Sequence, residues 1–135
     1  MVCIFCDILS GKREGHIVYE DDSHLAFLDK YPIDDGHTLV ITKKHYERIT
    51  DMDSDDVGKL FSLIPKIAKA VLLGAGADAF SLAQNNGKAA KQIIPHVHVH
   101  IIPRYNNKGT VWTKREIPTH EILSELAQKI KTNLT

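Results

Sequence analysis

The sequence is poor in cysteine and tryptophan and has no net charge. Its 135 residues include two cysteines and one tryptophan, and 17 basic residues balance 17 acidic ones. This balance gives no electrostatic reason to expect nucleic acid or an anionic membrane as a partner. No apolar run approaches the roughly 20 residues of a membrane-spanning helix, and no basic-then-apolar leader opens the chain. We therefore expect a cytoplasmic protein with no nucleic-acid or membrane partner.

Hydrophobic residues are plentiful enough for one globular domain. They make up 43% of the chain, and a chain of this length can bury a sizeable core. Because no internal repeat, low-complexity stretch or linker interrupts it, residues 1–135 are expected to form a single domain.

Histidine occupies every second position in the stretch HVHVHII at residues 96–102. A period of two is typical of a strand with unlike faces, and valine and isoleucine favour strands. Imidazoles two positions apart lie about 6.6 Å apart along one face, which is close enough to surround a small anion or a metal ion. Solvent-exposed strand faces usually carry lysine, glutamate and threonine, so exposure alone explains this row poorly.

Two kinds of chemistry fit a row of imidazoles. Histidine titrates near neutral pH, so one ring can attack as a nucleophile while others donate protons to a substrate oxygen. Alternatively, neutral imidazoles can bind zinc and leave a fourth position open for a catalytic water. The residues alone leave both alternatives open.

The two cysteines, Cys3 and Cys6, are spaced as half of a metal site and not as a framework disulfide. The eight histidines of the chain offer enough nitrogen ligands to complete a tetrahedral site. A pair of small, reduced, buried thiols and a redox pair are the alternatives.

Hydrophobic periodicity and turn residues predict an α+β domain with helices packed on an antiparallel sheet. Strands are expected at residues 16–20, 24–29, 38–42, 79–83 and 96–102, the last two pairing antiparallel. Three helices are expected. The first is a short N-terminal helical turn that ends at residues 10–11. The second is long and runs from the acidic residues 51–56 to Gly74 and Gly76, and the last begins after a cap at Thr119. Pro65 should kink the long helix. Residues 111–113 fit either a short edge strand or an arm.

With these features in view, the sequence resembles the histidine triad family of nucleotide hydrolases and transferases. Similar stretches accompany the histidine row: CIFCDI at 3–8, AFLD at 26–29, GHTLVI at 36–41, KKH at 43–45 and NNG at 85–87. The likeness spans most of residues 1–104, and residues 105–135 carry no family signal. It implies a five-stranded antiparallel sheet and a homodimer in which the sheets of two subunits join.

The resemblance implies that His98 is the nucleophile. It would attack the α-phosphate of a nucleotide and form a transient nucleotidyl-histidine, which water resolves, while a backbone carbonyl holds its other nitrogen protonated. His100 would donate to the phosphate oxygens as charge builds there, and His96 completes the catalytic row. This step needs no metal. The implied activity is a purine nucleoside phosphoramidase that releases AMP or GMP.

Substrate-binding roles also follow from the resemblance. Asp29 resembles the family's ribose-binding carboxylate, and Asn85 and Gln92 match positions that bind ribose or phosphate. Four apolar residues look like the base pocket: Phe5, Ile8, Phe27 and Leu39. The chain departs from the family at Ile93, where many members have serine or threonine, and Lys91 is a candidate to replace part of the missing phosphate contact.

Some members of the family bind zinc through residues that correspond here to Cys3, Cys6, His45 and His96. Such a zinc would be structural and would hold the N-terminal turn against the third and fifth strands. Three alternatives to the phosphoramidase stay open. They are a dinucleoside polyphosphate hydrolase, a zinc-stabilised nucleotide-binding or interaction module with little turnover, and a metal-dependent hydrolase that uses the triad as ligands.

Overall fold

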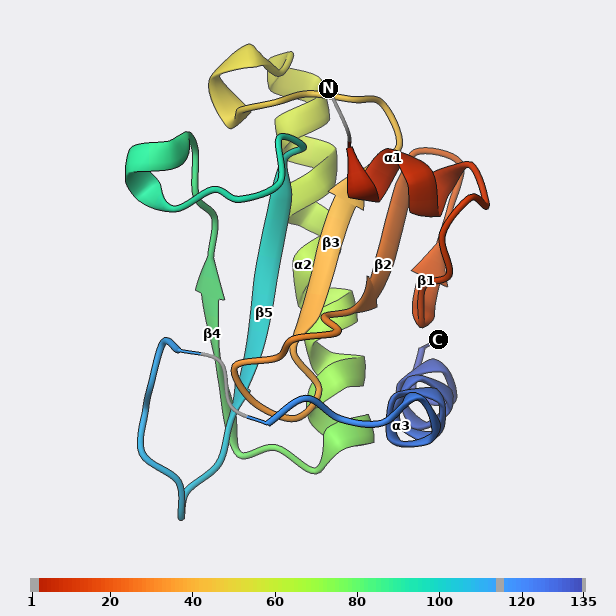
Figure 1. Ribbon diagram of the computed structural model, residues 1–135, viewed down its shortest axis with the longest axis vertical. Coiled ribbons are helices and arrows are strands. Elements are labelled where there is room, and N and C mark those ends of the chain that lie inside the picture. The colour runs from red at the N-terminus through yellow and green to blue at the C-terminus, as the bar shows by residue number, and fades with distance from the viewer. Residues whose placement is uncertain (1–2, 114–115, 135) are drawn as a thin grey trace.

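The computed structural model describes residues 3–113 and 116–134. Its centre is a five-stranded antiparallel sheet in the order β1-β2-β3-β5-β4 (Figure 1). The strands are β1 (Ile17–Glu20), β2 (His24–Leu28), β3 (Thr38–Thr42), β4 (Ala79–Ala83) and β5 (His98–Arg104). The helices are α1 (Ile4–Leu9), α2 (Ser54–Ala75) and α3 (His120–Lys131). The predicted α+β class, with its five-stranded antiparallel sheet and three helices, is confirmed.

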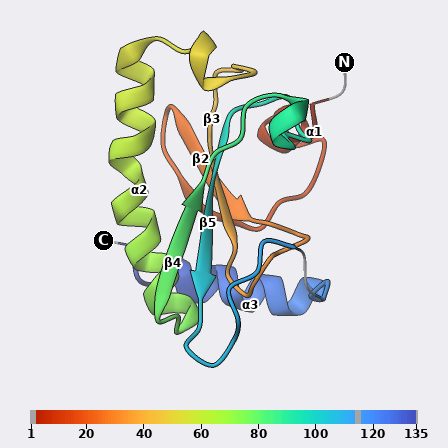
Figure 2. The same cartoon turned by 90° about the vertical axis from the view of Figure 1, so that its left-hand side faces the viewer.

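Different helices cover the two faces of the sheet. Views at right angles show α2 along one face and α1 over the other (Figure 1, Figure 2). Strand residues alternate between these faces: Val40 belongs to the core under α2, whereas Leu39 and Ile41 belong to the smaller cluster under α1. On β5, Val99 lies in the α2 core, which leaves His98 and the other even-numbered residues on the α1 face.

The long helix α2 ends at Gly76, whose φ of +68° lies in the left-handed region that favours glycine. It is continuous through Pro65, and the expected kink stays a prediction. The expectation that Gly74 also ends the helix is wrong, because Gly74 lies inside its last turn. A Cβ there would come within 2.8 Å of the backbone of Ile130, so glycine permits the close approach of α2 and α3.

The histidine row is only partly a strand. β5 begins at His98, and His96 lies in a bend before it. The backbone N–H of His96 donates to the carbonyl of Ile94, and that of Val97 donates to the carbonyl of Tyr46. These bonds turn the backbone away from the β3 ladder, which is why the strand predicted from residue 96 starts two residues later.

Residues 111–113 form an arm and not an edge strand. The guanidinium of Arg104 donates to the carbonyl of Val111 at 2.5 Å and lies 4.7 Å from the ring centroid of Trp112. These side-chain contacts hold the arm against the end of β5 in place of strand pairing. Among the described residues, no helix has both the length and the apolar character needed to cross a membrane.

Candidate active site and metal centre

His98 is buried on β5 with only 6% of its surface exposed. Its Nδ1 lies 2.7 Å from the carbonyl oxygen of His96. Since a carbonyl only accepts, Nδ1 carries the proton and Nε2 keeps its lone pair. Burial lowers the pKa of His98, so the ring is neutral at neutral pH. A neutral imidazole with an unprotonated Nε2 has the form that a nucleophile requires.

His100 is oriented by His37, a residue with no role predicted from the sequence. The backbone N–H of Ile33 donates to Nδ1 of His37 at 3.0 Å, so the proton of His37 is on Nε2, 2.9 Å from Nδ1 of His100. Nδ1 of His100 therefore accepts, and its own proton is on Nε2. Burial and then the neighbouring His98 lower the pKa of His100 to about 4. His100 is thus a neutral N–H donor whose ring centroid lies 4.8 Å from that of His98.

Asp29 continues this chain of polar contacts. Its Oδ2 lies 3.6 Å from Nε2 of His37, and its Oδ1 accepts the backbone N–H of Tyr31 at 2.8 Å. The pairing of β3 with β5 explains why His37 and His100 meet. Leu39 on β3 lies opposite His100 on β5, and His37 comes two residues before Leu39. The order of strands brings His37 to the triad, and a single sequence does not reveal that order.

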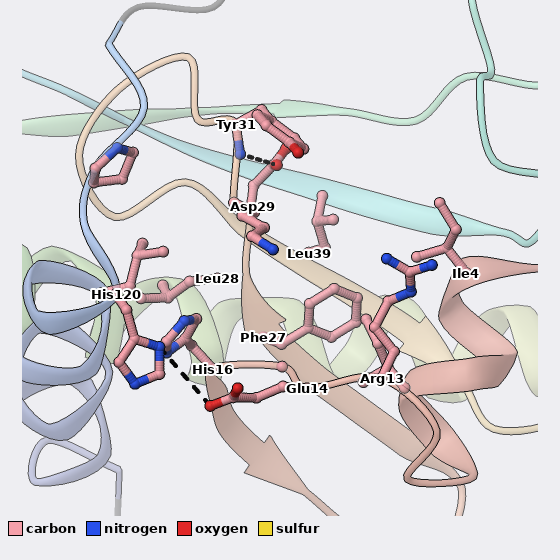
Figure 3. Close-up of a pocket in the computed structure, with 15 residues that line it drawn as sticks. Ile4, Arg13, Glu14, His16, Phe27, Leu28, Asp29, Tyr31, Leu39 and His120 are labelled. Carbon is pink, nitrogen blue, oxygen red and sulfur yellow. Dashed lines mark hydrogen bonds and ion pairs between the residues drawn. The ribbon is translucent and has the colours of Figure 1, made fainter.

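A cavity of about 330 Å³ opens beside Asp29 (Figure 3). Three residues of the predicted base pocket line it, namely Ile8, Phe27 and Leu39. Phe5 lies outside the lining, with its ring centroid 5.3 Å from Phe27 and 5.0 Å from His98. The cavity has the size and mainly apolar wall of a small-molecule site. Its lining also includes residues that the sequence did not indicate: Ile4, Arg13, Glu14, His16, Pro118 and His120.

The loop between β4 and β5 carries the other two predicted binding residues, and neither lines the cavity. Gln92 is buried, with Oε1 accepting the backbone N–H of Gly87 at 2.7 Å and Nε2 donating to the carbonyl of Glu47 at 2.6 Å. Its amide therefore holds the loop together. Asn85 is half-buried in the same loop, and Ile93 is 77% exposed. Contacts of Asn85 and Gln92 with substrate stay predictions.

Cys3, Cys6, His45 and His96 meet between α1, the end of β3 and the start of β5. One ligand atom from each lies within 4.8 Å of the others. Nδ1 of His96 is 3.5 Å from both sulfurs, and Nδ1 of His45 is 3.2 Å from the sulfur of Cys6. A tetrahedral zinc with ordinary bond lengths has a sulfur-to-nitrogen edge of about 3.6 Å. The four donors therefore fit zinc in both chemistry and size.

His96 connects this cluster to the nucleophile. Its side chain is fully buried, and Nε2 lies 2.7 Å from the carbonyl of Thr42, which leaves Nδ1 unprotonated toward the sulfurs. Burial lowers the pKa of His96 to about 4, and burial with the neighbouring Cys3 raises the pKa of Cys6 to about 11. The side chain of His96 faces the cysteines, whereas its carbonyl accepts from His98.

A second group of possible ligand atoms is formed by Asp29, His37 and His100. Within the described part of the chain, neither of the two groups contains His98. Each triad histidine therefore has different neighbours. His96 belongs to the cysteine cluster, His98 is bound to a backbone carbonyl, and His100 is bound to His37. This geometry does not favour the alternative in which all three bind one catalytic metal.

Comparison with known proteins decides the family. A model of the HIT domain matches residues 10–107. The chain belongs to the HIT family. An uncharacterized HIT-like protein of Methanocaldococcus jannaschii is 42% identical over 130 residues, which cover 96% of this chain and 99% of that protein.

Two HIT-like relatives carry enzyme names. An adenosine 5'-monophosphoramidase of Schizosaccharomyces pombe is 36% identical over 137 residues, 97% of this chain and 100% of that protein. An adenylylsulfatase of Arabidopsis thaliana is 38% identical over 120 residues, 89% of this chain and 60% of that protein. These relationships support a HIT-family nucleotide hydrolase.

Solved structures of HIT proteins share the fold. A hypothetical histidine triad nucleotide-binding protein of Sulfolobus tokodaii superposes with a TM-score of 0.91 at 35% identity, covering 98% of this chain and 91% of that one. A zinc-bound histidine triad family protein of Mycobacterium smegmatis has a TM-score of 0.88 at 35% identity, covering 99% and 94%. The family expected from the histidine row is confirmed.

Proposed function

We propose that the protein is a purine nucleoside phosphoramidase that releases AMP or GMP. The observation that carries this proposal is the pairing of His98, with an unprotonated Nε2, and His100, with a protonated Nε2, at a ring distance of 4.8 Å. A neutral nucleophile beside a neutral donor suits attack on a phosphate whose oxygens gain charge. The phosphoramidase of Schizosaccharomyces pombe, similar over nearly the whole chain, supports the choice of substrate.

In the proposed reaction, Nε2 of His98 forms a bond to the α-phosphorus as the bond to the leaving nitrogen breaks. The departing amine takes up one proton from solvent. The Nε2–H of His100 donates to the phosphoryl oxygens during this step. Water then attacks phosphorus, the bond to His98 breaks, and the proton that water loses returns to solvent. Asp29 at the cavity accepts from the ribose hydroxyls.

The test is release of monophosphate from adenosine phosphoramidate and from a dinucleoside tetraphosphate. His98→Ala should lower turnover by about 10³-fold or more, as removal of a nucleophile does. His24→Gln is the control, because His24 pairs with Asp21 in the β1–β2 turn, outside the cavity lining. Wild-type turnover by His98→Ala would refute the covalent mechanism. Faster hydrolysis of the tetraphosphate would favour a polyphosphate hydrolase, and binding without turnover would favour a binding module.

We also propose that Cys3, Cys6, His45 and His96 hold a structural zinc. The matching donor geometry and the zinc-bound relative support this. With four protein ligands, the ion would have no position open to substrate, and it would fix His96 and hence the carbonyl that accepts from His98. Wild-type protein should carry near-stoichiometric zinc by metal analysis, and Cys3→Ser should carry much less and melt at a lower temperature. A metal-free, stable wild type would refute the proposal.

A homodimer is the proposed assembly. β4 is an edge strand of the sheet, with Phe80 40% and Leu82 47% exposed. An edge strand presents unpaired backbone groups that a second copy can pair with, and exposed large apolar side chains favour such a contact. The cytoplasmic location and the lack of nucleic-acid and membrane partners stay predictions.

A further inference from the structure

We infer that a polar rim formed by Arg13, Glu14, His16 and His120 contacts the edge of the bound base and sets the preference between purines. This inference rests on the proposed function, since it concerns what occupies the cavity. It assigns a role to α3, which lies outside the residues 10–107 that match the HIT domain.

The rim lies around an apolar wall. Figure 3 shows Phe27 at the middle of the cavity, with Arg13 on one side, His16 and His120 on the opposite side and Asp29 at another end. A flat base packs its faces against apolar side chains such as Phe27. If Asp29 binds the ribose, the polar edges of the base point toward the rim.

The loop between α1 and β1 holds the first half of the rim in place. The backbone N–H of Arg13 donates to the carbonyl of Asp7 at 3.1 Å. A Cβ on Gly15 would lie 3.0 Å from Cγ2 of Ile8, so glycine lets the loop close onto the cavity wall. The backbone thus holds this loop at the cavity, where the exposed residues Arg13 and Glu14 form part of the lining.

Helix α3 supplies the second half of the rim. The ring centroids of His16 and His120 are 4.7 Å apart, and Nδ1 of His120 lies 3.8 Å from a carboxylate oxygen of Glu14. Leu123, one turn along the helix, also lines the cavity. Burial and then the neighbouring His120 lower the pKa of His16, so its neutral ring offers one donor and one acceptor. Segments from both ends of the chain therefore meet at this rim.

The rim has the chemistry to distinguish purines. Arg13 only donates hydrogen bonds and Glu14 only accepts them. Guanine presents O6 as an acceptor where adenine presents an amino donor. An apolar pocket discriminates weakly between ligands of one shape, whereas a site with directed polar groups rejects the ligand that leaves them unpaired. The preference between AMP and GMP should therefore depend on the rim and not on the apolar wall.

The experiment measures the affinities of AMP and GMP for the full chain by titration calorimetry. Arg13→Ala and Glu14→Gln should each change the ratio of the two affinities by about fivefold, the loss of one hydrogen bond. His120→Ala should change the ratio of the AMP and GMP affinities by less than about fivefold. Lys12→Ala is the matched control, because Lys12 is an exposed residue of the same loop outside the cavity lining. Thermal melts show that each variant is folded.

A ratio that stays at the wild-type value in all three rim variants would overturn the inference, and so would a wild type that binds neither nucleotide. An equally large change of the affinity ratio in Lys12→Ala would also count against the inference, because the change would then come from the net charge of the loop and not from contacts with the base. Turnover is measured separately. A wild type that binds both nucleotides with a rim-dependent ratio but hydrolyses no phosphoramidate would refute the proposed turnover, and the rim would then set the purine preference of a nucleotide-binding module.

Discussion

The protein contacts at least one ring nitrogen of each triad histidine, and the contacts differ in which nitrogen is used or in whether that nitrogen donates or accepts. Nε2 of His96 is bound by the carbonyl of Thr42, and Nδ1 of His98 by the carbonyl of His96. Nδ1 of His100 accepts from His37. Because the nitrogen left over decides what an imidazole can do, these contacts give three identical side chains three different capacities.

The contact between His37 and His100 leads to a prediction for His37→Phe. This variant removes the N–H that Nδ1 of His100 accepts, so His100 no longer has a fixed proton on Nε2. We expect kcat to fall by about 10- to 100-fold, less than the loss of a general acid or base itself, with little change in KM. His37→Gln retains an N–H donor and should recover part of kcat. Equal activity of the two variants would show that His37 acts only through packing.

The pH dependence of activity follows from burial of the triad. Burial lowers the pKa of His98 and lowers that of His100 to about 4. Protonation of His98 removes the attacking lone pair, so activity is present above its lowered pKa and is lost as pH falls through it. The value of kcat/KM should therefore stay level across pH ~6.5, where an ordinary imidazole titrates. An inflection at that pH in the acid limb of the profile would contradict the expectation.

At the scale of elements, β5 serves both the core and the site. Val99 and Ile101 are fully buried in the core under α2, and His98 and His100 occupy the opposite face. The strand is held on both sides because it lies between β3 and β4. A change of register by one residue would exchange the two faces, so the core pattern also fixes where the imidazoles point.

The contact between α2 and α3 gives a stability prediction. A Cβ at Gly74 would meet the backbone of Ile130 at 2.8 Å, so Gly74→Ala should destabilise the protein by about 1–3 kcal/mol, as overpacking does. Gly58 is the matched control, because it lies on an exposed part of α2 and its Cβ would meet nothing within 4 Å. Gly58→Ala should stabilise by about 0.5–1 kcal/mol. Urea unfolding measures the free energy of unfolding of both variants. Equal stabilisation by the two substitutions would contradict the prediction, because α3 would then shift to accommodate the added methyl group at no cost.

At the scale of the whole molecule, the proposed dimer predicts the effect of a charge on β4. Leu82→Lys places a charge on the exposed edge strand and should convert a wild-type dimer to monomers in sedimentation experiments. Leu73→Lys is the control, because Leu73 is 60% exposed but belongs to α2 and not to the edge strand. Dissociation of both variants, or a monomeric wild type, would refute a dimer formed through β4.

Local patterns of residues were enough to predict the elements and the separate parts of the site. Period-two alternation, helical periodicity and capping residues act over neighbouring positions, so the sheet strands, α1, α2 and α3 were largely predictable. The spacing of Cys3 and Cys6 and the histidine row are equally local features. The resemblance to the histidine triad family then correctly indicated that His45 and His96 would join the cysteines in one cluster.

How these parts meet depends on contacts between elements that are distant in the chain. The bond between His37 and His100 depends on β3 lying beside β5, and the contact of His16 with His120 joins segments about a hundred residues apart. The role of Gly74 likewise depends on where α3 crosses α2. A local pattern shows which face a residue occupies but not what lies opposite that face. Strand order and helix packing, which follow from burial of the whole core, supply those contacts.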